Sequence, residues 1–337
     1  IEQLCRAFVK HPFVPASTSE FDSRAQEILN IQLTGLARRM ISANIEKLII
    51  GLSGGLDSTL AFLVCLETLK SRAIEVKNLI AVTLPGPGTS EHTLQSVHEL
   101  TESVDVKVRE IKIHTAVEQH LSDIEHSGNT DTVFENAQAR ERTQVLFDLA
   151  NQEAGIVVGT GDLSELALGW CTFNADQMSN YNVNVSVPKT MIIYLVEWYA
   201  KHKASKNLAL ALKRVIDTPI SPELIPPEQG EIQQKTEEVI GPYELHDFFI
   251  YHFLRNGSSP TKIFHLAKLA YKEKYSQKEI QKWLKLFFER FFSQQFKRTT
   301  LPPGPKIGSV SLSPRGDWRM PDEASATIYT KEIEALI

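Results

Sequence analysis

The chain has 337 residues, of which 42% are hydrophobic and 23% charged, with a formal net charge of −5 at pH 7. This length is enough for one large domain with a substantial core, and the balanced charge excludes an extended nucleic-acid footprint, which needs clustered Lys and Arg. No apolar run is long enough to predict a membrane span, and the three scattered cysteines favour a reducing, cytoplasmic location.

Short apolar runs alternate with helical patterns through the first half of the chain. Buried parallel strands are short, continuous and β-branched, whereas helices repeat apolar residues at steps of three and four. The alternation predicts an α/β fold with a doubly wound, mostly parallel, Rossmann-like sheet, whose ligand lies beyond the carboxyl ends of the strands. The predicted strands are residues 47–51, 76–83, 106–113 and 155–159, and the predicted helices are residues 29–40, 59–69, 94–100 and 136–149.

The second half of the chain is predicted to be mainly helical. Residues 185–260 carry helical patterns separated by Pro-rich turns, residues 276–296 form an aromatic helix, and residues 301–321 are turn-rich and basic. His246 and His252 lie on an aromatic segment, so we expect them to be packing or capping residues.

The strongest local signal is the loop Gly51-Leu-Ser53-Gly54-Gly55-Leu-Asp57-Ser58, between a predicted strand and a predicted helix. Glycines let backbone N–H groups approach a phosphate, and the helix N-terminus adds its own N–H groups. The loop has no Walker-type lysine. A carboxylate beside a phosphate needs a cation between them, so Asp57 is predicted to bind Mg²⁺. The competing interpretation is a simple helix cap, because Asp and Ser are good N-caps.

The segment Ser53–Ser58 resembles the PP-loop of the ATP pyrophosphatase superfamily. Members of this superfamily cleave ATP to AMP and pyrophosphate while they adenylate a substrate. They include the NAD, GMP, asparagine and argininosuccinate synthetases and the tRNA-thiolating enzymes. The loop alone does not choose among them.

Six further sequence blocks distinguish among these members. They resemble glutamine-dependent NAD synthetases, and the resemblance runs from about Glu27 to Pro321. The resemblance implies an adenine-nucleotide α-hydrolase type of sheet. It also implies a linker at residues 1–26, an NAD synthetase domain at residues 27–300 and a turn-rich tail at residues 301–337. The blocks are Glu135–Arg142, Gly159–Trp170, Tyr181–Thr190, Gly241–Phe249, Ser293–Arg298 and Ser309–Met320.

The same resemblance implies roles for individual residues. Asp57, Glu165 and Lys189 are the expected catalytic residues, with Asp57 and Glu165 holding Mg²⁺ and Lys189 neutralising phosphates. The expected ATP contacts are Gly51, Ser53, Gly54, Gly55, Ser58, Thr160 and Ser221. The expected deamido-NAD contacts are Asn136, Arg140, Glu165, Trp170, Cys171, Thr172, Phe173 and Lys297.

The activity implied is conversion of deamido-NAD to NAD with ATP and ammonia through an adenylated intermediate, releasing AMP and pyrophosphate. Asp162 and Asp176 are candidates to take the proton from ammonia. The family also implies a homodimer or higher homo-oligomer and an N-terminal glutaminase domain. Because the chain begins at Ile1 without Met, we expect it to be cut from a longer protein and to use free ammonia by itself.

The sequence departs from the family pattern in one stretch. Cys171, Ala175 and Gln177 stand where the family implies Ala, Gly and His, and Phe173 stands where it implies Tyr. Two alternatives remain beside the NAD synthetase interpretation: another PP-loop amidotransferase or thiolase, and a nucleotide-binding module without catalysis. Thiolases usually pair catalytic cysteines, and mere binding has less need of the carboxylates and lysine named above.

Overall fold

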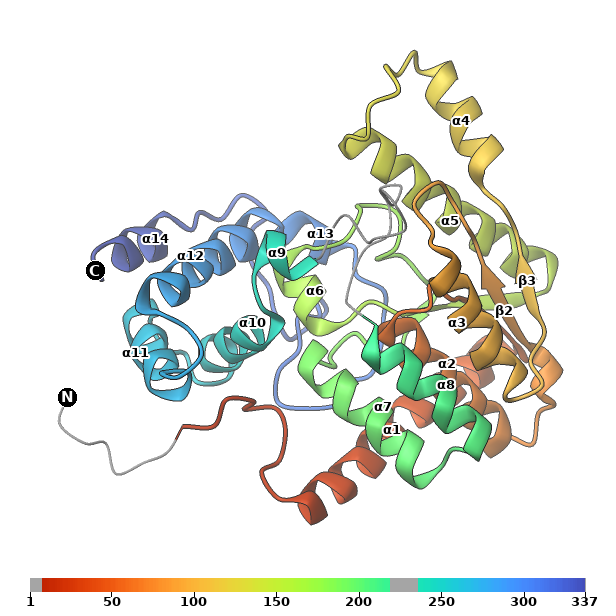
Figure 1. Cartoon of the computed structure of the whole chain (residues 1–337), viewed down its shortest axis with the longest axis horizontal. Coiled ribbons are helices and arrows are strands. Elements are labelled where there is room, and N and C mark those ends of the chain that lie inside the picture. The colour runs from red at the N-terminus through yellow and green to blue at the C-terminus, as the bar shows by residue number, and fades with distance from the viewer. Residues whose placement is uncertain (1–7, 219–235, 337) are drawn as a thin grey trace.

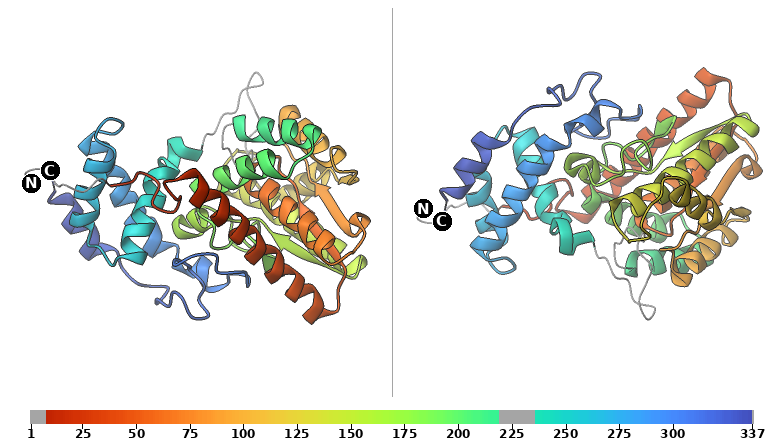
Figure 2. Two further views of the ribbon diagram at one scale, coloured as in Figure 1. Left: turned by 90° about the horizontal axis from the view of Figure 1, so that it is seen from below. Right: turned by 90° about the horizontal axis from the view of Figure 1, so that it is seen from above.

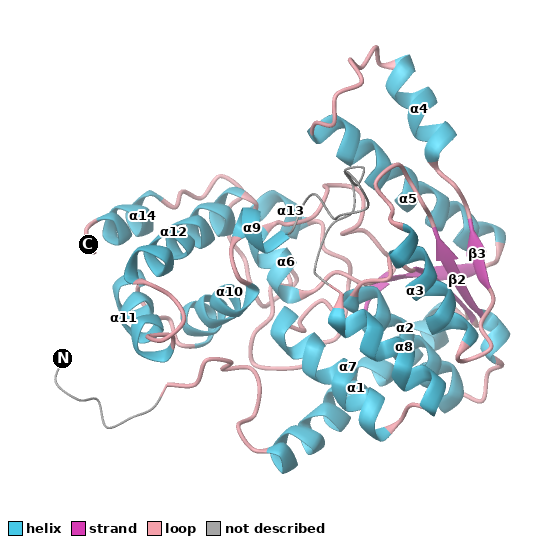
Figure 3. Ribbon diagram, in the orientation of Figure 1, coloured by secondary structure: helices cyan, strands magenta, loops and turns pink. Residues whose placement is uncertain are grey.

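The computed structural model describes residues 8–218 and 236–336. Its α/β part is built on a five-stranded parallel sheet with the order β3-β2-β1-β4-β5 (Figures 1 and 3). The predicted doubly wound parallel sheet is therefore confirmed. The strands are β1 (Lys47–Gly51), β2 (Leu79–Thr83), β3 (Val108–Glu110), β4 (Gly155–Gly159) and β5 (Tyr181–Asn182).

Helices cover both faces of this sheet. In β1, Leu48 and Ile50 pack into one core, with helices α1, α2, α3, α7 and α8. Ile49 points the other way, into a smaller core with α4 and α5. This alternation follows from the two-residue repeat of a strand. The bounds are α1 (Thr18–Ala43), α2 (Leu56–Ser71), α3 (Glu91–Glu102), α4 (His114–Asp123), α5 (Thr132–Gln152), α7 (Lys189–His202) and α8 (Lys206–Asp217).

The remaining helices form a lobe beside the sheet (Figure 2). Its core is aromatic and includes Phe249, Phe287, Phe288 and Phe291, all fully buried. The short helix α6 contributes its apolar residues to this lobe although it directly follows β4, so it joins the two parts of the molecule. The bounds are α6 (Leu163–Leu168), α9 (Thr236–Ile240), α10 (Tyr243–Ile250), the π-helical turn η2 (Tyr251–Arg255), α11 (Pro260–Ala270), α12 (Gln277–Ser293), α13 (Gln295–Thr299) and α14 (Thr327–Glu334).

Some predicted bounds are wrong. The predicted strand 76–83 begins with a 3-10 turn, η1 (Val76–Asn78), before β2, and the predicted strand 106–113 shortens to β3. Exposure explains the second error, because Arg109 and Glu110 are exposed at the edge of the sheet. The two-residue strand β5 was not predicted, since two residues are too few to show a strand pattern.

The first and last described segments both pack against the helical lobe. Before α1, the carbonyl of Lys10 accepts a hydrogen bond from the Tyr271 hydroxyl at 2.5 Å. At the other end, the Tyr329 ring of α14 stacks on Phe288 with ring centroids 4.8 Å apart. α1 begins inside the predicted linker and α14 lies inside the predicted tail, so the division at residues 26 and 300 stays a prediction. No helix among the described residues is long and apolar enough to cross a membrane.

We predict that His246 makes the fold sensitive to acid. The residue is fully buried, and its Nε2 atom lies 2.7 Å from the Ile240 carbonyl oxygen, as expected for a packing residue. Burial lowers the pKa of His246 to about 4, whereas an unfolded histidine titrates near pH 6.5. As the pH falls below about 6.5 the unfolded chain takes up this proton first, which lowers the free energy of unfolding by up to about 3 kcal/mol.

Urea denaturation at neutral and mildly acidic pH measures this effect. The His246→Gln variant should lose less stability between the two pH values than the parent chain does. The exposed α4 residue His120 supplies the control, because His120→Gln should retain the acid sensitivity of the parent. Equal acid sensitivity in all three proteins would contradict the assignment to His246.

Candidate active site

The loop after β1 is shaped to hold an anion. Gly54 has a φ of 74°, and a Cβ there would lie 2.9 Å from the Thr93 carbonyl oxygen, so the position needs glycine. The Ser53 hydroxyl accepts a hydrogen bond from the Gly55 N–H at 3.3 Å, and the Ser58 hydroxyl donates to the Gly55 carbonyl at 3.1 Å. Among the described residues no side chain caps the N-terminus of α2, which leaves its N–H groups and positive dipole end available.

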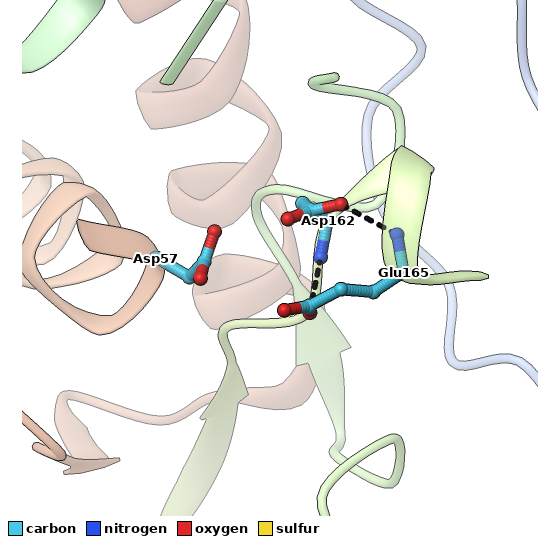
Figure 4. A group of neighbouring side chains, drawn as sticks. All are labelled: Asp57, Asp162 and Glu165. Carbon is cyan, nitrogen blue, oxygen red and sulfur yellow. Dashed lines mark hydrogen bonds between the residues drawn. The ribbon is translucent and has the colours of Figure 1, made fainter. Parts of the chain in front are cut away.

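Three carboxylates and one ammonium meet beyond the carboxyl ends of β1 and β4. Asp57 lies in the first turn of α2, while Asp162 and Glu165 lie at the start of α6 (Figure 4). The Nζ atom of Lys189, the first residue of α7, lies 2.5 Å from Asp57 Oδ2. The same atom lies 2.7 Å from Asp162 Oδ2 and 2.9 Å from Glu165 Oε1. The strand order reverses between β1 and β4, and doubly wound sheets bind ligands at that point.

The charged groups of this cluster are largely shielded from water. The Lys189 side chain is only 1% exposed. Burial disfavours its ammonium, but Asp162, Asp57 and Glu165 outweigh that cost and hold the pKa of Lys189 well above its ordinary value. Burial also raises the pKa of Glu165 to about 7, against the opposing effect of Lys189. One ammonium therefore faces three carboxyl groups, an arrangement that favours a further cation.

The carboxylates fit a hard divalent ion. One oxygen from each of Asp57, Asp162 and Glu165 lies within 4.8 Å of the others, and Mg²⁺ takes oxygen ligands while keeping several of its waters. Asp57 and Glu165 are 21% and 22% exposed, whereas Asp162 is wholly buried beside Lys189. The open side of the cluster is therefore lined by the two residues predicted as metal ligands. That role stays a prediction.

Local capping fixes the two acidic residues of α6. Asp162 is the N-cap, and its side chain accepts a hydrogen bond from the Glu165 N–H at 2.8 Å. Glu165 Oε2 accepts from the Asp162 N–H at 3.5 Å, which completes a capping box. This box leaves the second oxygen of each carboxylate for Lys189, so the same two residues start the helix and build the site.

Three cationic side chains from the helical lobe hold the other end of α6. Positive charge at a helix C-terminus complements the helix dipole, and here each cation also satisfies carbonyl groups that the short helix leaves unpaired. α6 is therefore anchored at both ends by charge. The bonds run from Arg290 Nε to the Leu168 carbonyl at 2.8 Å, from Lys297 Nζ to the Gly169 carbonyl at 2.8 Å, and from Arg298 Nη1 to the Ala167 carbonyl at 3.0 Å.

The residues predicted to contact deamido-NAD surround the loop after α6. The Thr172 hydroxyl donates to Asn136 Oδ1 at 3.0 Å and so joins the loop to α5. The Phe173 ring lies 5.4 Å from that of Phe296 in α13. The ring of Trp170 lies 5.3 Å from the Arg290 guanidinium carbon.

The other predicted residues are distributed more widely. Lys297 also donates to the Cys171 carbonyl at 2.7 Å, so its described contacts hold the loop itself. Arg140 is exposed on α5. Ser221, predicted to contact ATP, lies outside the described residues. Gly51 is the last residue of β1 and the first of the predicted phosphate loop.

Two of the departures from the family pattern touch each other. The Cys171 thiol lies 3.5 Å from Gln177 Oε1. The Gln177 amide donates to the Lys297 carbonyl at 3.0 Å and to the Thr300 hydroxyl at 2.9 Å. Residues 171 and 177 therefore differ from the pattern as a contacting pair, and they tie the loop to α13.

Sequence reasoning gave no role to Asn184, although it braces the site. Its amide donates to the Asp57 carbonyl at 2.9 Å and to the Thr160 carbonyl at 3.1 Å, so it bridges the segments that follow β1 and β4. Its side-chain oxygen, Oδ1, accepts a hydrogen bond from the side-chain amide of Gln32 in α1 at 3.1 Å. The available signal was the alternation of Asn182, Asn184 and Ser186 with valines. Tyr243 was also missed, and Lys189 Nζ lies 5.1 Å from its ring centroid.

Comparisons with known proteins identify the family of the chain. The family model described as NAD synthase matches residues 28–299. The glutamine-dependent NAD(+) synthetase of Mycobacterium leprae is 41% identical over an alignment that covers 98% of this chain and 52% of that protein. The chain thus spans about half the length of the curated relatives it matches.

Solved structures support the fold. A glutamine-dependent NAD(+) synthetase from Cytophaga hutchinsonii aligns with a TM-score of 0.73 at 18% identity, covering 93% of this chain and 56% of that one. The Acinetobacter baumannii glutamine-dependent enzyme in complex with ADP aligns with a TM-score of 0.53 at 22% identity, covering 89% of this chain and 49% of that one.

The position of Lys189 predicts competition between its ammonium and a divalent cation. Both need the same carboxylate oxygens, so Lys189→Met should strengthen Mn²⁺ binding without nucleotide on the order of tenfold or more. Isothermal titration with Mn²⁺ measures the affinity. Lys47→Met, which removes a surface ion pair to Glu153, is the matched control and should bind as the parent does. Weaker Mn²⁺ binding by the Lys189 variant would show that the ammonium supports the metal site instead.

Proposed function

We propose that this chain, which belongs to the NAD synthase family, converts deamido-NAD to NAD with ATP and ammonia. The observation that carries the proposal is the meeting of Asp57, Glu165 and Lys189 beside the loop after β1. A phosphate loop, an acidic pair open to a metal and a buried cation at one sheet edge suit cleavage of ATP.

ATP is proposed to bind with its phosphates against the loop. Ser53, Gly54, Gly55 and Ser58 line that loop, and the N-terminus of α2 attracts negative charge. Thr160 is proposed as a further ATP contact, because Asn184 joins its backbone to that of Asp57.

Asp57 and Glu165 are proposed to hold Mg²⁺. When bound, the ion neutralises phosphate charge as a Lewis acid. Lys189 contributes a fixed positive charge. The neighbouring carboxylates hold its pKa well above the ordinary value, so it stays protonated near neutral pH. Charge held in place before the reaction lowers the cost of stabilising the departing pyrophosphate.

The chemistry proceeds in two displacements. The nicotinate carboxylate attacks the α-phosphorus of ATP, the bond to pyrophosphate breaks, and a mixed anhydride with AMP forms. Ammonia then attacks the carbonyl carbon, the bond to AMP breaks, and one proton leaves the nitrogen. Asp162 is buried against Lys189, whereas Asp176 is exposed and accepts a hydrogen bond from the Thr172 N–H at 2.8 Å. Asp176 is therefore the better-placed proton acceptor.

The loop after α6 and its neighbours are the proposed deamido-NAD site. Asn136, Thr172 and Phe173 supply polar and aromatic contacts between α5 and α13. Trp170, Cys171, Arg140 and Lys297 complete the proposed set. In a full-length protein, ammonia is proposed to come from glutamine at an N-terminal glutaminase domain. That source, a homo-oligomer and a cytoplasmic location stay predictions.

The activity is tested by measuring NAD formed from deamido-NAD, ATP and Mg²⁺ with ammonium as the nitrogen source. We expect one AMP and one pyrophosphate for each NAD, with a rate that rises above neutral pH because free ammonia is the nucleophile. Replacement of ammonium by glutamine in a parallel reaction identifies the nitrogen source. Pyrophosphate release that does not depend on deamido-NAD would reject the proposed acceptor.

Asp57→Asn tests the metal ligand. The side chain keeps its size, but the amide cannot supply the same charge, so kcat should fall at least about 100-fold with the thermal midpoint preserved. Asp123→Asn, at the exposed end of α4, is the matched control and should keep full activity. A variant that retains near-normal turnover and Mg²⁺ dependence would remove Asp57 from the metal site.

A further inference from the structure

Asp247 of α10 is a buried carboxylate beside the site, and none of the roles assigned above uses it. Its side chain is 1% exposed. Asp247 Oδ2 accepts hydrogen bonds from the Thr190 N–H at 2.9 Å and from the Thr190 hydroxyl at 2.6 Å. Its other oxygen, Oδ1, accepts from the Ser164 hydroxyl. These donors belong to α7 and α6, so one carboxylate of α10 holds the two helices that carry Lys189 and Glu165.

The hydrogen bonds lead directly to Lys189. The Ser164 hydroxyl, which donates to Asp247, accepts from the Lys189 N–H at 2.9 Å. Lys189 and Thr190 are the first two residues of α7, and their N–H groups have no partner within the helix. The N-cap residue is Pro188, whose side chain has no acceptor. Ser164 and Asp247, which lie on other helices, therefore cap the N-terminus of α7 in place of an N-cap side chain.

Capping at this place has a consequence for the ammonium. A lysine side chain has four carbon–carbon bonds about which it turns, and its Nζ atom meets three carboxylates only if its backbone is held in place. The α7 N-terminus presents a positive dipole end toward Lys189, which is unfavourable for a cation, and the Asp247 carboxylate offsets that field. Small displacements of a group that stabilises reacting charge are costly for the rate.

Helix α10 reaches Lys189 a second time. Tyr243 lies one turn before Asp247 on the same helix, and its ring centroid is 5.1 Å from Lys189 Nζ. One helix of the lobe thus contacts the ammonium of this lysine directly, through Tyr243, and its backbone N–H indirectly, through Ser164.

We propose that Asp247 is a positioning residue, which acts through Ser164 and Thr190 to hold Lys189 among its carboxylates. The inference rests on the proposed function of Lys189 in stabilising phosphate charge. Asp247 itself touches no reacting atom. Its removal should therefore lower kcat more than it changes the KM for ATP or deamido-NAD, because the interaction lost is one that strengthens in the transition state.

The principal variant is Asp247→Asn. An amide keeps the shape but turns an NH₂ group toward at least one of the three donors, so at least one of the bonds that the carboxylate accepts is lost, together with the charge that offsets the α7 dipole. We expect kcat to fall about tenfold or more and each KM to change less than about threefold. Ser205→Ala, which removes the serine N-cap of α8, is the matched control: it costs a helix cap of the same kind and should leave kcat unchanged. Asp247→Asn kinetics no different from those of the control would overturn the proposal.

A double-mutant cycle separates positioning from a general structural role. Asp247→Asn should have little further effect on kcat in a Lys189→Met background, since its action passes through that lysine. Fully multiplicative losses would overturn the proposal. If Asp247→Asn does not fold, Ser164→Ala cuts only the branch to the Lys189 N–H and should show the same kcat loss and the same non-additivity; an unchanged kcat overturns the proposal.

Amide hydrogen exchange gives a readout that does not depend on activity. The Asp247→Asn variant should exchange faster than the parent at the Lys189 and Thr190 amides, with the amides of α8 unchanged. Faster exchange there, together with an active parent enzyme and the kcat loss, supports the inference. An inactive parent would instead count against the proposed function, whereas unchanged exchange at these two amides would overturn the positioning role alone.

Discussion

The site depends on one buried ammonium held by three carboxylates. Lys189 is nearly without solvent, so its charge persists only because Asp57, Asp162 and Glu165 lie within 2.9 Å of it. Asp57 lies in the first turn of α2, Asp162 and Glu165 lie at the start of α6, and Lys189 begins α7. The cluster therefore forms only when α2, α6 and α7 are already packed together, which ties the chemistry of the site to the tertiary fold.

Parallel topology explains why these segments meet. The sheet order places β1 beside β4, and the chain leaves these strands in opposite directions along the sheet. The loops that follow them separate there and leave room for a ligand. The cores on the two faces hold α2 and α5 apart, and Asn184 joins the backbones of the two loops. The opening is thus a consequence of strand order, and the asparagine fixes its width.

Sequence patterns predicted the parts of the site that follow strands. Asp57 and Glu165 come directly after β1 and β4, so a parallel sheet alone brings them to one edge. The pairing of Lys189 with Asp162 was not predictable in this way, because it depends on how α7 returns across the sheet. The roles of Asn184 and Asp247 were not predicted for the same reason, because their partners are backbone groups and hydroxyls distant in sequence. The strand β5 was not predicted because two residues are too few to show a periodicity.

The position of Glu165 follows from the helical lobe rather than from its own segment. α6 has six residues, and a helix that short does not form alone, since nucleation costs more than so few hydrogen bonds return. Its apolar residues pack into the aromatic core, and Arg290 and Arg298 bind its last carbonyls. Asp162 and Glu165 then find favourable places at its N-terminus. The packing of α6 against the rest of the lobe therefore positions two of the three carboxylates of the cluster.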